Sequence, residues 1–532
     1  MTRADVAAGT ESTPVDATPE ATAGSATDAS NGTAEQRRYA WLVLSVTSLG
    51  MVLTGLNGSM LNVALPRVVA HFSAGPFAAN WLLLSFMLVS TVMIVVFGRL
   101  ADIFGRREMY LFGFAVFTAA SFLAGLSPDV WVLIGLRAVQ ATGAAMILAN
   151  SSALITAAFP PGLLAQGMGI YMATISIASL IGPSLGGALV AAAGWQWVFW
   201  FNVPVGVVAT AWGVVTLRRV PPGPREKVDV PGNLLVFLLL GGLLLALSEG
   251  GTLGWTAPAV VVGGLAFVLL LPPFLWWERR TDHPVVDLSL FKDRYFTLAS
   301  LAAFFQTLAR FSVVLIFALL FQSLYGDDPF AAGLKVMPVP LGMLIASPLT
   351  GYLGRSYDQR RVSTWGSVVT TGGLVVLLLS LRASPSYVVI ALGLLLSGLG
   401  TGIFLTANTT AIMSRAPADR LGIVNGVRLM VQNCGIVIGT ALVLALITSP
   451  LDSSARGNVY AGDVAHLSAR HTDQLVTGYR WALAVMVLAA IVGGFASHGD
   501  SDNRLRRLVR RHGPAVTPHA ADAVTVTHIE GG

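Results

Sequence analysis

The sequence predicts an all-α integral membrane protein with fourteen transmembrane helices. Hydrophobic residues make up 54% of the 532 residues and charged residues only 11%, and the mean hydropathy is +0.71. This composition excludes an ordinary soluble domain. The apolar residues also gather in stretches of about 18 to 25 residues, the length at which a helix crosses a bilayer. The predicted spans are residues 40–63, 80–98, 108–126, 130–151, 166–190, 197–217, 232–249, 257–277, 297–322, 331–353, 362–381, 387–413, 422–447 and 479–497.

The distribution of lysine and arginine predicts that both termini are cytoplasmic. With the N-terminus inside, the inner segments contain most of the basic residues and the outer loops contain few, which is the positive-inside pattern. The net charge of +6 therefore reflects membrane orientation. The basic stretch Arg504–Arg511 is expected to contact anionic lipid headgroups, and no nucleic-acid partner is predicted.

The two ends of the chain are predicted to lie outside the membrane, as a disordered N-terminal tail (1–37) and a basic C-terminal tail (498–532). Residues 1–36 are rich in Ala, Thr, Ser, Gly, Asp and Glu and offer little apolar area to bury. They contain no apolar core of a cleaved signal peptide, so the first span is expected to direct insertion into the cell membrane.

The fifth span contains the segment GPSLGG, which predicts a helix built for close packing. Gly182 and Gly186 are four residues apart and share one helix face, and Gly187 widens the notch between them. Small residues at this spacing let two membrane helices approach closely. Pro183 removes one backbone donor, which a membrane helix tolerates where neighbouring protein compensates.

The loop between the second and third spans reads GRLADIFGRR. Gly98 and Gly105 bracket a tight turn that holds Asp102 among arginines, of which Arg106 is four residues away. An aspartate at the mouth of a helix binds an arginine or the N-terminus of another helix. A plain positive-inside loop with turn glycines would not require that aspartate.

This loop, the segment LRAVQATGAA in the fourth span and GPSLGG in the fifth occur in an order and spacing that resemble the major facilitator superfamily. Four further segments resemble its fourteen-span drug–proton antiporter branch: LNGSMLNVALP (Leu56–Pro66), GWQWVFWFNVPVG (Gly194–Gly206), HPVVDLSLFKDRYF (His283–Phe296) and GLGTGIFLTANTTAI (Gly398–Ile412). The resemblance covers about residues 40–497.

The resemblance implies two pseudo-symmetric six-helix bundles, residues 38–217 and 297–497, joined by a linker (218–296) that contains two inserted helices. It implies alternating access between the bundles, with substrate held near the midplane. It also implies export of amphipathic drugs or antibiotic-like compounds in exchange for protons, with no cofactor. Gly98, Asp102, Gly105 and Arg106 would form a cytoplasmic gate.

The sequence departs from the family pattern at two positions where an acidic residue is usual, and these departures bear on how a proton could be carried. Asn57 stands where the branch commonly has an aspartate, and an amide cannot titrate. In the second copy of the loop signature, Gly351–Arg361, Arg355 occupies the usual place of an acid. The proton is then expected to travel with the substrate or with a water beside Arg137. Alternatively Glu249, Asp129 or Asp327 titrates in the outer cavity, although a solvated loop acid is the ordinary interpretation of Glu249 and Asp327.

The charged residues placed deep within spans are cationic. An arginine in a membrane helix should face protein or water, either lining a cavity or bonding neighbouring helices as a strut. If several line one cavity, its positive potential favours neutral or anionic amphiphiles. The residues predicted to form this coupling and substrate cavity are Asn57, Arg137, Gln140, Arg310, Arg428 and Asn433.

Two other functions remain open at this point: a sensor or assembly protein that no longer transports, and an uncoupled or uptake carrier. The sequence contains no GxxxxGK[ST] phosphate-binding loop, which excludes an ATP-driven pump without a partner subunit. No His pair or Cys cluster predicts a metal site, and neither an enzymatic function nor an obligatory protein partner is predicted.

Overall fold

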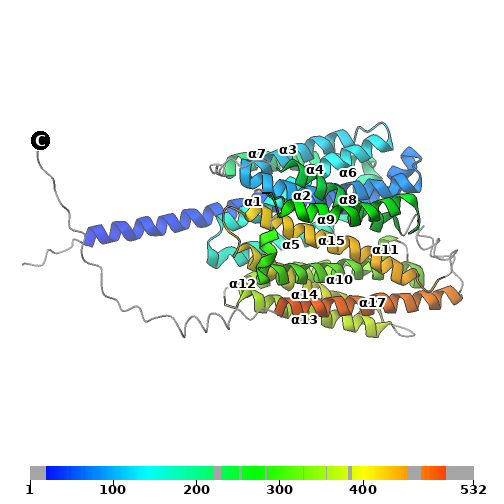
Figure 1. Cartoon of the computed structure of the whole chain (residues 1–532). Coiled ribbons are helices and arrows are strands. Elements are labelled where there is room, and N and C mark those ends of the chain that lie inside the picture. The colour runs from blue at the N-terminus through cyan, green and yellow to red at the C-terminus, as the bar shows by residue number, and fades with distance from the viewer. Residues whose placement is uncertain are drawn as a thin grey trace, which may run out of the picture. The chain divides into compact units, whose positions relative to one another are not determined.

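The structure is a computed structural model that describes residues 19–219, 229–250, 254–281, 284–286, 288–327, 329–354, 356–381, 386–451 and 469–498. Every regular element within these residues is a helix, and the long helices run side by side (Figure 1). Thirteen segments of this described part are long and apolar enough to cross a membrane. The prediction of an all-α integral membrane protein is confirmed.

The remaining predicted span, 108–126, corresponds to helix α3 (Arg106–Ala124). It is less apolar than the other spans because its first turn carries Arg106, Arg107 and Glu108. Arg107 donates hydrogen bonds to the carbonyl oxygens of Val214 and Leu217 at the end of a neighbouring helix. These bonds place the charged first turn of α3 beside the end of the sixth predicted span.

The first bundle contains α1 (Pro19–Phe72), α2 (Pro76–Phe104), α3, α4 (Val130–Ala158), α5 (Pro161–Ala193), the short α6 (Trp197–Trp200) and α7 (Asn202–Thr216). Helix α1 packs against α4, α5 and α7, while α4 also contacts α2 and α3. Residues 19–37 are helical, unlike the predicted disordered tail, since their alanines favour a helix. Residues 1–18 lie outside the described part.

An inserted pair follows, α8 (Val230–Gly250) and α9 (Pro258–Glu278), and then a short 3-10 helix, η1 (Leu288–Lys292). The pair packs tightly through glycines, because a Cβ atom at Gly242 would lie 2.7 Å from the carbonyl oxygen of Gly263. Helix α8 also contacts α2 and α15, one helix from each bundle. It therefore lies over the line where the bundles meet.

The second bundle contains α10 (Arg294–Tyr325), α11 (Pro329–Lys335), α12 (Pro338–Leu353), α13 (Gln359–Ser380), α14 (Tyr387–Met413), α15 (Leu421–Thr448) and α17 (Ala469–His498). The predicted span 331–353 coincides with the apolar segment Ala331–Leu353, inside which the structure interrupts the helix between α11 and α12. The break lies at Val336 and Met337, directly before Pro338, whose ring nitrogen cannot donate a helical hydrogen bond. Most of the predicted C-terminal tail, residues 499–532, lies outside the described residues.

The two bundles meet along two pairs of helices, α2 with α15 and α5 with α12. Both contacts are made where glycines remove the side chain. A Cβ atom at Gly98 would lie 2.5 Å from the carbonyl oxygen of Gly422, and one at Gly169 would lie 2.5 Å from that of Ser347. The backbones of the two bundles therefore touch directly at both places.

Candidate functional site

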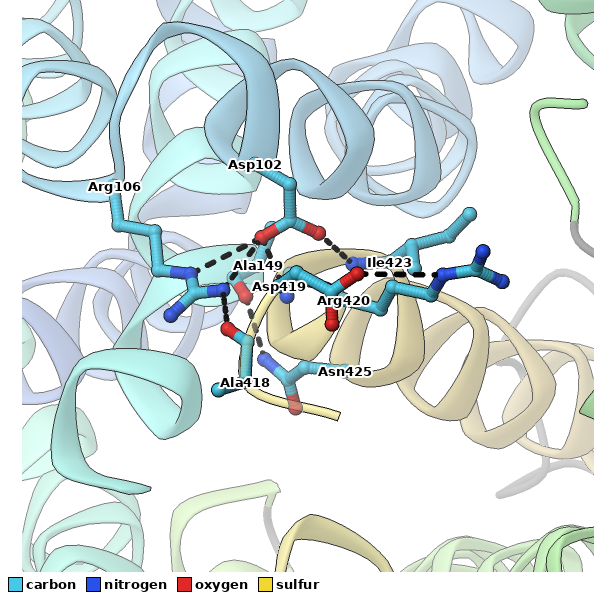
Figure 2. A network of polar contacts seen from close by, with 9 residues as sticks. Asp102, Arg106, Ala149, Ala418, Asp419, Arg420, Ile423 and Asn425 are labelled. Carbon is cyan, nitrogen blue, oxygen red and sulfur yellow. Dashed lines mark hydrogen bonds and ion pairs between the residues drawn. The ribbon is translucent and has the colours of Figure 1, made fainter. Parts of the chain in front are cut away.

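Asp102 joins the two bundles at the end of the α2–α15 contact (Figure 2). Its carboxylate accepts hydrogen bonds from the backbone N–H groups of Gly422 and Ile423, at 3.1 and 3.0 Å. These are among the first N–H groups of α15, which have no partner within the helix and carry its positive dipole end. A carboxylate is the ligand that such a helix terminus prefers, so Asp102 caps a helix of the opposite bundle.

Arg106 completes this joint. It donates two hydrogen bonds to Asp102, at 3.1 and 2.9 Å, and a third to the carbonyl oxygen of Ala418 at 2.6 Å. Gly105, between α2 and α3, has a φ angle of +103°, which side chains rarely permit. This turn lets α3 start directly after α2. It also places the Arg106 side chain within hydrogen-bonding distance of Asp102. The four residues predicted as a gate, Gly98, Asp102, Gly105 and Arg106, therefore act at one place in the structure.

Two further contacts close the same end of the molecule. Asn425 on α15 donates hydrogen bonds to the carbonyl oxygens of Leu148 and Ala149 on α4, at 3.1 and 2.7 Å. On the other side, a Cβ atom at Gly351 of α12 would lie 2.8 Å from the Cα atom of Gln166 on α5. Sequence reasoning missed Asn425, although an asparagine in an apolar helix is a recognisable signal.

Arg137 lies inside the first bundle with only 2% of its surface exposed. Its guanidinium donates hydrogen bonds to Gln140 at 2.6 Å and to the Leu82 carbonyl at 3.3 Å, and it stacks 4.4 Å from the ring centre of Phe86. Within the described residues no carboxylate lies in salt-bridge distance of it. Its positive charge is thus surrounded by dipoles and an aromatic face.

Gln140 connects Arg137 to Asn57. It donates hydrogen bonds to Asn57 at 3.1 Å and to Ser121 at 2.7 Å, and Asn202 also points its amide at Asn57, at 3.4 Å. The structure therefore brings Asn57, Arg137 and Gln140 together, as predicted. It adds Asn202, which sequence reasoning did not select. Among the described residues the amide nitrogen of Asn57 has no hydrogen-bond partner, which leaves a buried donor for a ligand or water.

Arg428 forms a separate cluster on α15, where it is also 2% exposed. It donates to the side-chain oxygen of Asn425 at 2.7 Å, to Thr409 at 3.2 Å and to Gln432 at 3.3 Å. Because Asn425 in turn binds the backbone of α4, Arg428 orients a residue that holds the two bundles together.

The last two predicted cavity residues lie apart from these clusters. Arg310 on α10 is half-buried, 4.0 Å from the ring centre of Phe311, and donates to the sulfur of Met343 at 3.5 Å. Asn433 donates to Thr91 on α2 at 3.2 Å, a second polar link between the bundles. The six residues thus do not share one set of contacts in this conformation.

The glycines of α5 pack against α1, as the notch predicts. A Cβ atom at Gly186 would lie 2.9 Å from the Cα atom of Met60, and one at Gly182 would collide with Ser59. Gly187 makes only ordinary contact, 3.7 Å from Val63. Pro183 lies inside α5, which continues to Ala193.

The three acids considered for proton coupling differ in their surroundings. Asp129 caps α4 by accepting from the N–H groups of Trp131 and Val132. Asp327 pairs with Lys335. Glu249, for which a solvated loop acid is the ordinary interpretation from sequence, is only 1% exposed and lies in the last turn of α8.

A family model described as Major Facilitator Superfamily matches residues 47–244, 232–440 and 299–498 of the chain. The chain is 33% identical over 417 residues to the multidrug resistance protein Stp of Mycobacterium tuberculosis, covering 78% of this chain and 77% of that protein. It is 31% identical to the methylenomycin A resistance protein of Bacillus subtilis, covering 75% and 86%. It is 29% identical to the riboflavin transporter RibZ of Clostridioides difficile, covering 75% and 87%.

Among solved structures, the chain is similar to the human organic anion transporter MFSD10, with a TM-score of 0.57 at 14% identity. The match covers 85% of this chain and 99% of that one, and at this identity it shows the fold alone. The helical architecture, the joined bundles and the family match agree with one another. The chain belongs to the Major Facilitator Superfamily, a family of membrane transporters rather than enzymes.

Proposed function

We propose that this transporter exports amphipathic drugs or antibiotic-like natural products across the cytoplasmic membrane by alternating access, in exchange for protons. The observation that carries the proposal is the Asp102 joint, in which one bundle caps a helix of the other. A few hydrogen bonds at one end of the contact can break and re-form, which is what alternating access requires. The relatives named for drug and antibiotic resistance support this substrate class.

The positive-inside pattern supports an orientation with both termini and the Asp102 end in the cytoplasm. The four residues Gly98, Asp102, Gly105 and Arg106 then form the cytoplasmic gate, and the conformation described has that gate closed. Gly182, Pro183, Gly186 and Gly187 would keep α5 close to α1 while the bundles move.

The proton pathway must avoid Asn57, which cannot titrate. Glu249 is the strongest of the acids considered, because it is only 1% exposed and lies on α8. Its burial and its place on α8, which contacts both bundles, support a role in coupling. The alternative route is a proton carried by the substrate itself, near Arg137.

The substrate class we propose is neutral or anionic amphiphiles. The support is the charge of the bundle interiors, where Arg137 and Arg428 are buried with amide and hydroxyl partners. The described carboxylates that are similarly buried, Glu249 and Glu278, both belong to the inserted pair α8 and α9. A substrate near the bundle interiors would therefore experience a positive potential.

The proposal is tested in inverted vesicles with a respiration-driven pH gradient. Neutral, anionic and cationic amphiphiles are added in turn, and collapse of the gradient is followed optically. We expect neutral and anionic compounds to collapse the gradient, and Arg137→Ala vesicles to lose the response. A response to quaternary ammonium dyes alone would contradict the substrate class, and silence with folded protein would favour the non-transporting alternative.

An uptake carrier is the second candidate, because a relative is named as a riboflavin transporter. Right-side-out vesicles separate the two functions: an uptake carrier accumulates labelled riboflavin, whereas the proposed exporter does not. In inverted vesicles an uptake carrier does not accumulate riboflavin, whereas the proposed exporter accumulates its amphipathic substrates.

A further inference from the structure

A cavity of about 120 Å³ lies between α2, α8 and α15, outside the clusters described above. Its lining is almost entirely apolar. Trp81 and Leu84 contribute from α2, Leu244 and Leu245 from the inserted helix α8, and Thr440 and Ala441 from α15.

The cavity lies on the line of contact between the two bundles, in the half away from the gate. Trp81 and Asp102 are 21 residues apart on α2, which places them about 30 Å apart along the helix axis. Met87 also lines the cavity and lies one turn before Thr91 on α2, while Val437 lies one turn after Asn433 on α15. The cavity therefore borders the hydrogen bond from Asn433 to Thr91 that links the bundles.

The size and chemistry of the cavity restrict its occupant. Pockets that enclose a whole drug-sized ligand measure about 300 to 1,000 Å³, so this cavity accommodates only part of one. Leucine, tryptophan and methionine side chains favour hydrocarbon, and each buried methylene contributes about 0.8 kcal/mol. A flexible alkyl chain fits these conditions better than a fused ring system does.

We propose that this cavity is a lateral binding site for the alkyl chain of a single-chain amphiphile, which enters from the lipid between α8 and the bundle contact. The site deepens the proposed export function, on which its role as a substrate entrance rests. Helix α8 forms its outer wall, and the chain end lies against the contact between the bundles. A molecule bound there touches the contact between α2 and α15 and can change it without reaching the buried arginines.

The test uses the full-length protein in phospholipid nanodiscs and a twelve-carbon alcohol that carries a photoreactive diazirine at the chain end. Labelled peptides are identified by mass spectrometry, without any ion gradient. We expect saturable labelling of α2, α8 and α15 at the cavity, displaced by unlabelled dodecanol. Labelling that rises linearly and spreads evenly over lipid-facing helices would overturn the site, because the cavity would then hold only bilayer lipid.

Two variants change the cavity in opposite directions. Ala441→Phe fills it and should lower the labelling about tenfold, the effect of overpacking by more than 1 kcal/mol. Ala259→Phe, at an exposed alanine of α9 that does not line the cavity, is the matched control and should label normally. Leu245→Ala widens the cavity and should strengthen labelling by a chain with a terminal phenyl ring about threefold. If neither cavity variant changes labelling by its probe, the proposal that this cavity binds an alkyl chain is wrong.

Parallel transport measurements separate this site from the export function. Saturable labelling of a protein that exports no amphiphile would support the binding site and contradict the proposed export function. Normal export without saturable labelling would contradict the binding site but not the proposed export function.

Discussion

At the residue scale, two buried arginines are stabilised by polar groups that carry no negative charge. Arg137 and Arg428 are surrounded by side-chain amides, hydroxyls and a backbone carbonyl. An arginine at the centre of a membrane helix costs several kcal/mol unless such groups solvate it. Asn57 takes part in the network around Arg137 through Gln140, which binds both residues. These two arginines therefore have identifiable partners, and single substitutions around them should have distinct consequences.

Asp102→Asn should weaken the closed gate while the protein remains in the membrane. Hydrogen bonds to a charged group contribute about 1.5 to 3 kcal/mol each, so we expect the closed state to lose about 2 kcal/mol and transport to fall at least tenfold. The measurement is the export rate in vesicles at equal protein level. Asp419→Asn is the matched control, since Asp419 is exposed and forms an ion pair with the adjacent Arg420 at 3.7 Å. Equal export rates in the two variants would show that Asp102 has no role in closing the gate.

Glu249→Gln should separate proton movement from substrate movement. Glutamine keeps the size of the side chain but cannot carry a proton, so substrate-evoked collapse of the pH gradient should disappear while amphiphile binding persists. Asp129→Asn is the control, because asparagine is also a good helix cap and should leave coupling intact. Retained coupling in Glu249→Gln would assign the proton to the substrate instead.

At the scale of the elements, glycine determines which helices touch across the molecule. The contact of α2 with α15 depends on Gly98, Gly422 and Gly426, each of which places backbone against backbone. The contact of α5 with α12 depends on Gly169 and Gly351 in the same way. Of the two contacts, the first also carries the Asp102 hydrogen bonds. The close approach of α2 and α15 brings the Asp102 carboxylate within hydrogen-bonding distance of the first N–H groups of α15.

Gly98→Leu should hold the gate open. A side chain at this position collides with the Gly422 carbonyl, and no rotamer avoids backbone atoms at 2.5 Å. We expect export to fall more than tenfold, with increased alkylation of a cysteine introduced at Ala418. Gly135→Leu on α4 is the control, because a Cβ atom there has no atom within 4 Å. Normal export by Gly98→Leu would show that the bundles do not need this close contact.

At the scale of the whole molecule, the hydrogen bonds described above link the two bundles, and the inserted helix α8 lies over their contact line. The links from α15 to the first bundle are Asp102, Asn425 and the pair of Asn433 with Thr91. Each link joins residues more than 270 positions apart in the chain. A relative movement of the bundles must break them together, which makes the closed state cooperative.

Cross-linking across this contact should stop transport reversibly. Cysteines at Thr91 and Asn433, in a Cys434→Ser background, lie close enough for a short bis-methanethiosulfonate, which links them through two reducible disulfide bonds. We expect the reagent to abolish export and a reductant to restore it, because alternating access requires the bundles to separate. Each single-cysteine variant serves as a control and should stay active. Full export by the cross-linked protein would exclude bundle separation at this contact.

The sequence alone determined the membrane class, the spans and the resemblance to the family, because hydropathy and glycine spacing are local properties. It also selected Asp102, Arg106 and the group of Asn57, Arg137 and Gln140. The tertiary structure decided which groups these residues meet: the α15 terminus for Asp102, 320 positions away, and Asn202 beside Asn57. It alone revealed the burial of Glu249, the break before Pro338 and the separate contacts of Arg310, with Met343 and Phe311. These features depend on how separate helices pack, and no local pattern of residues specifies the partner across a helix interface.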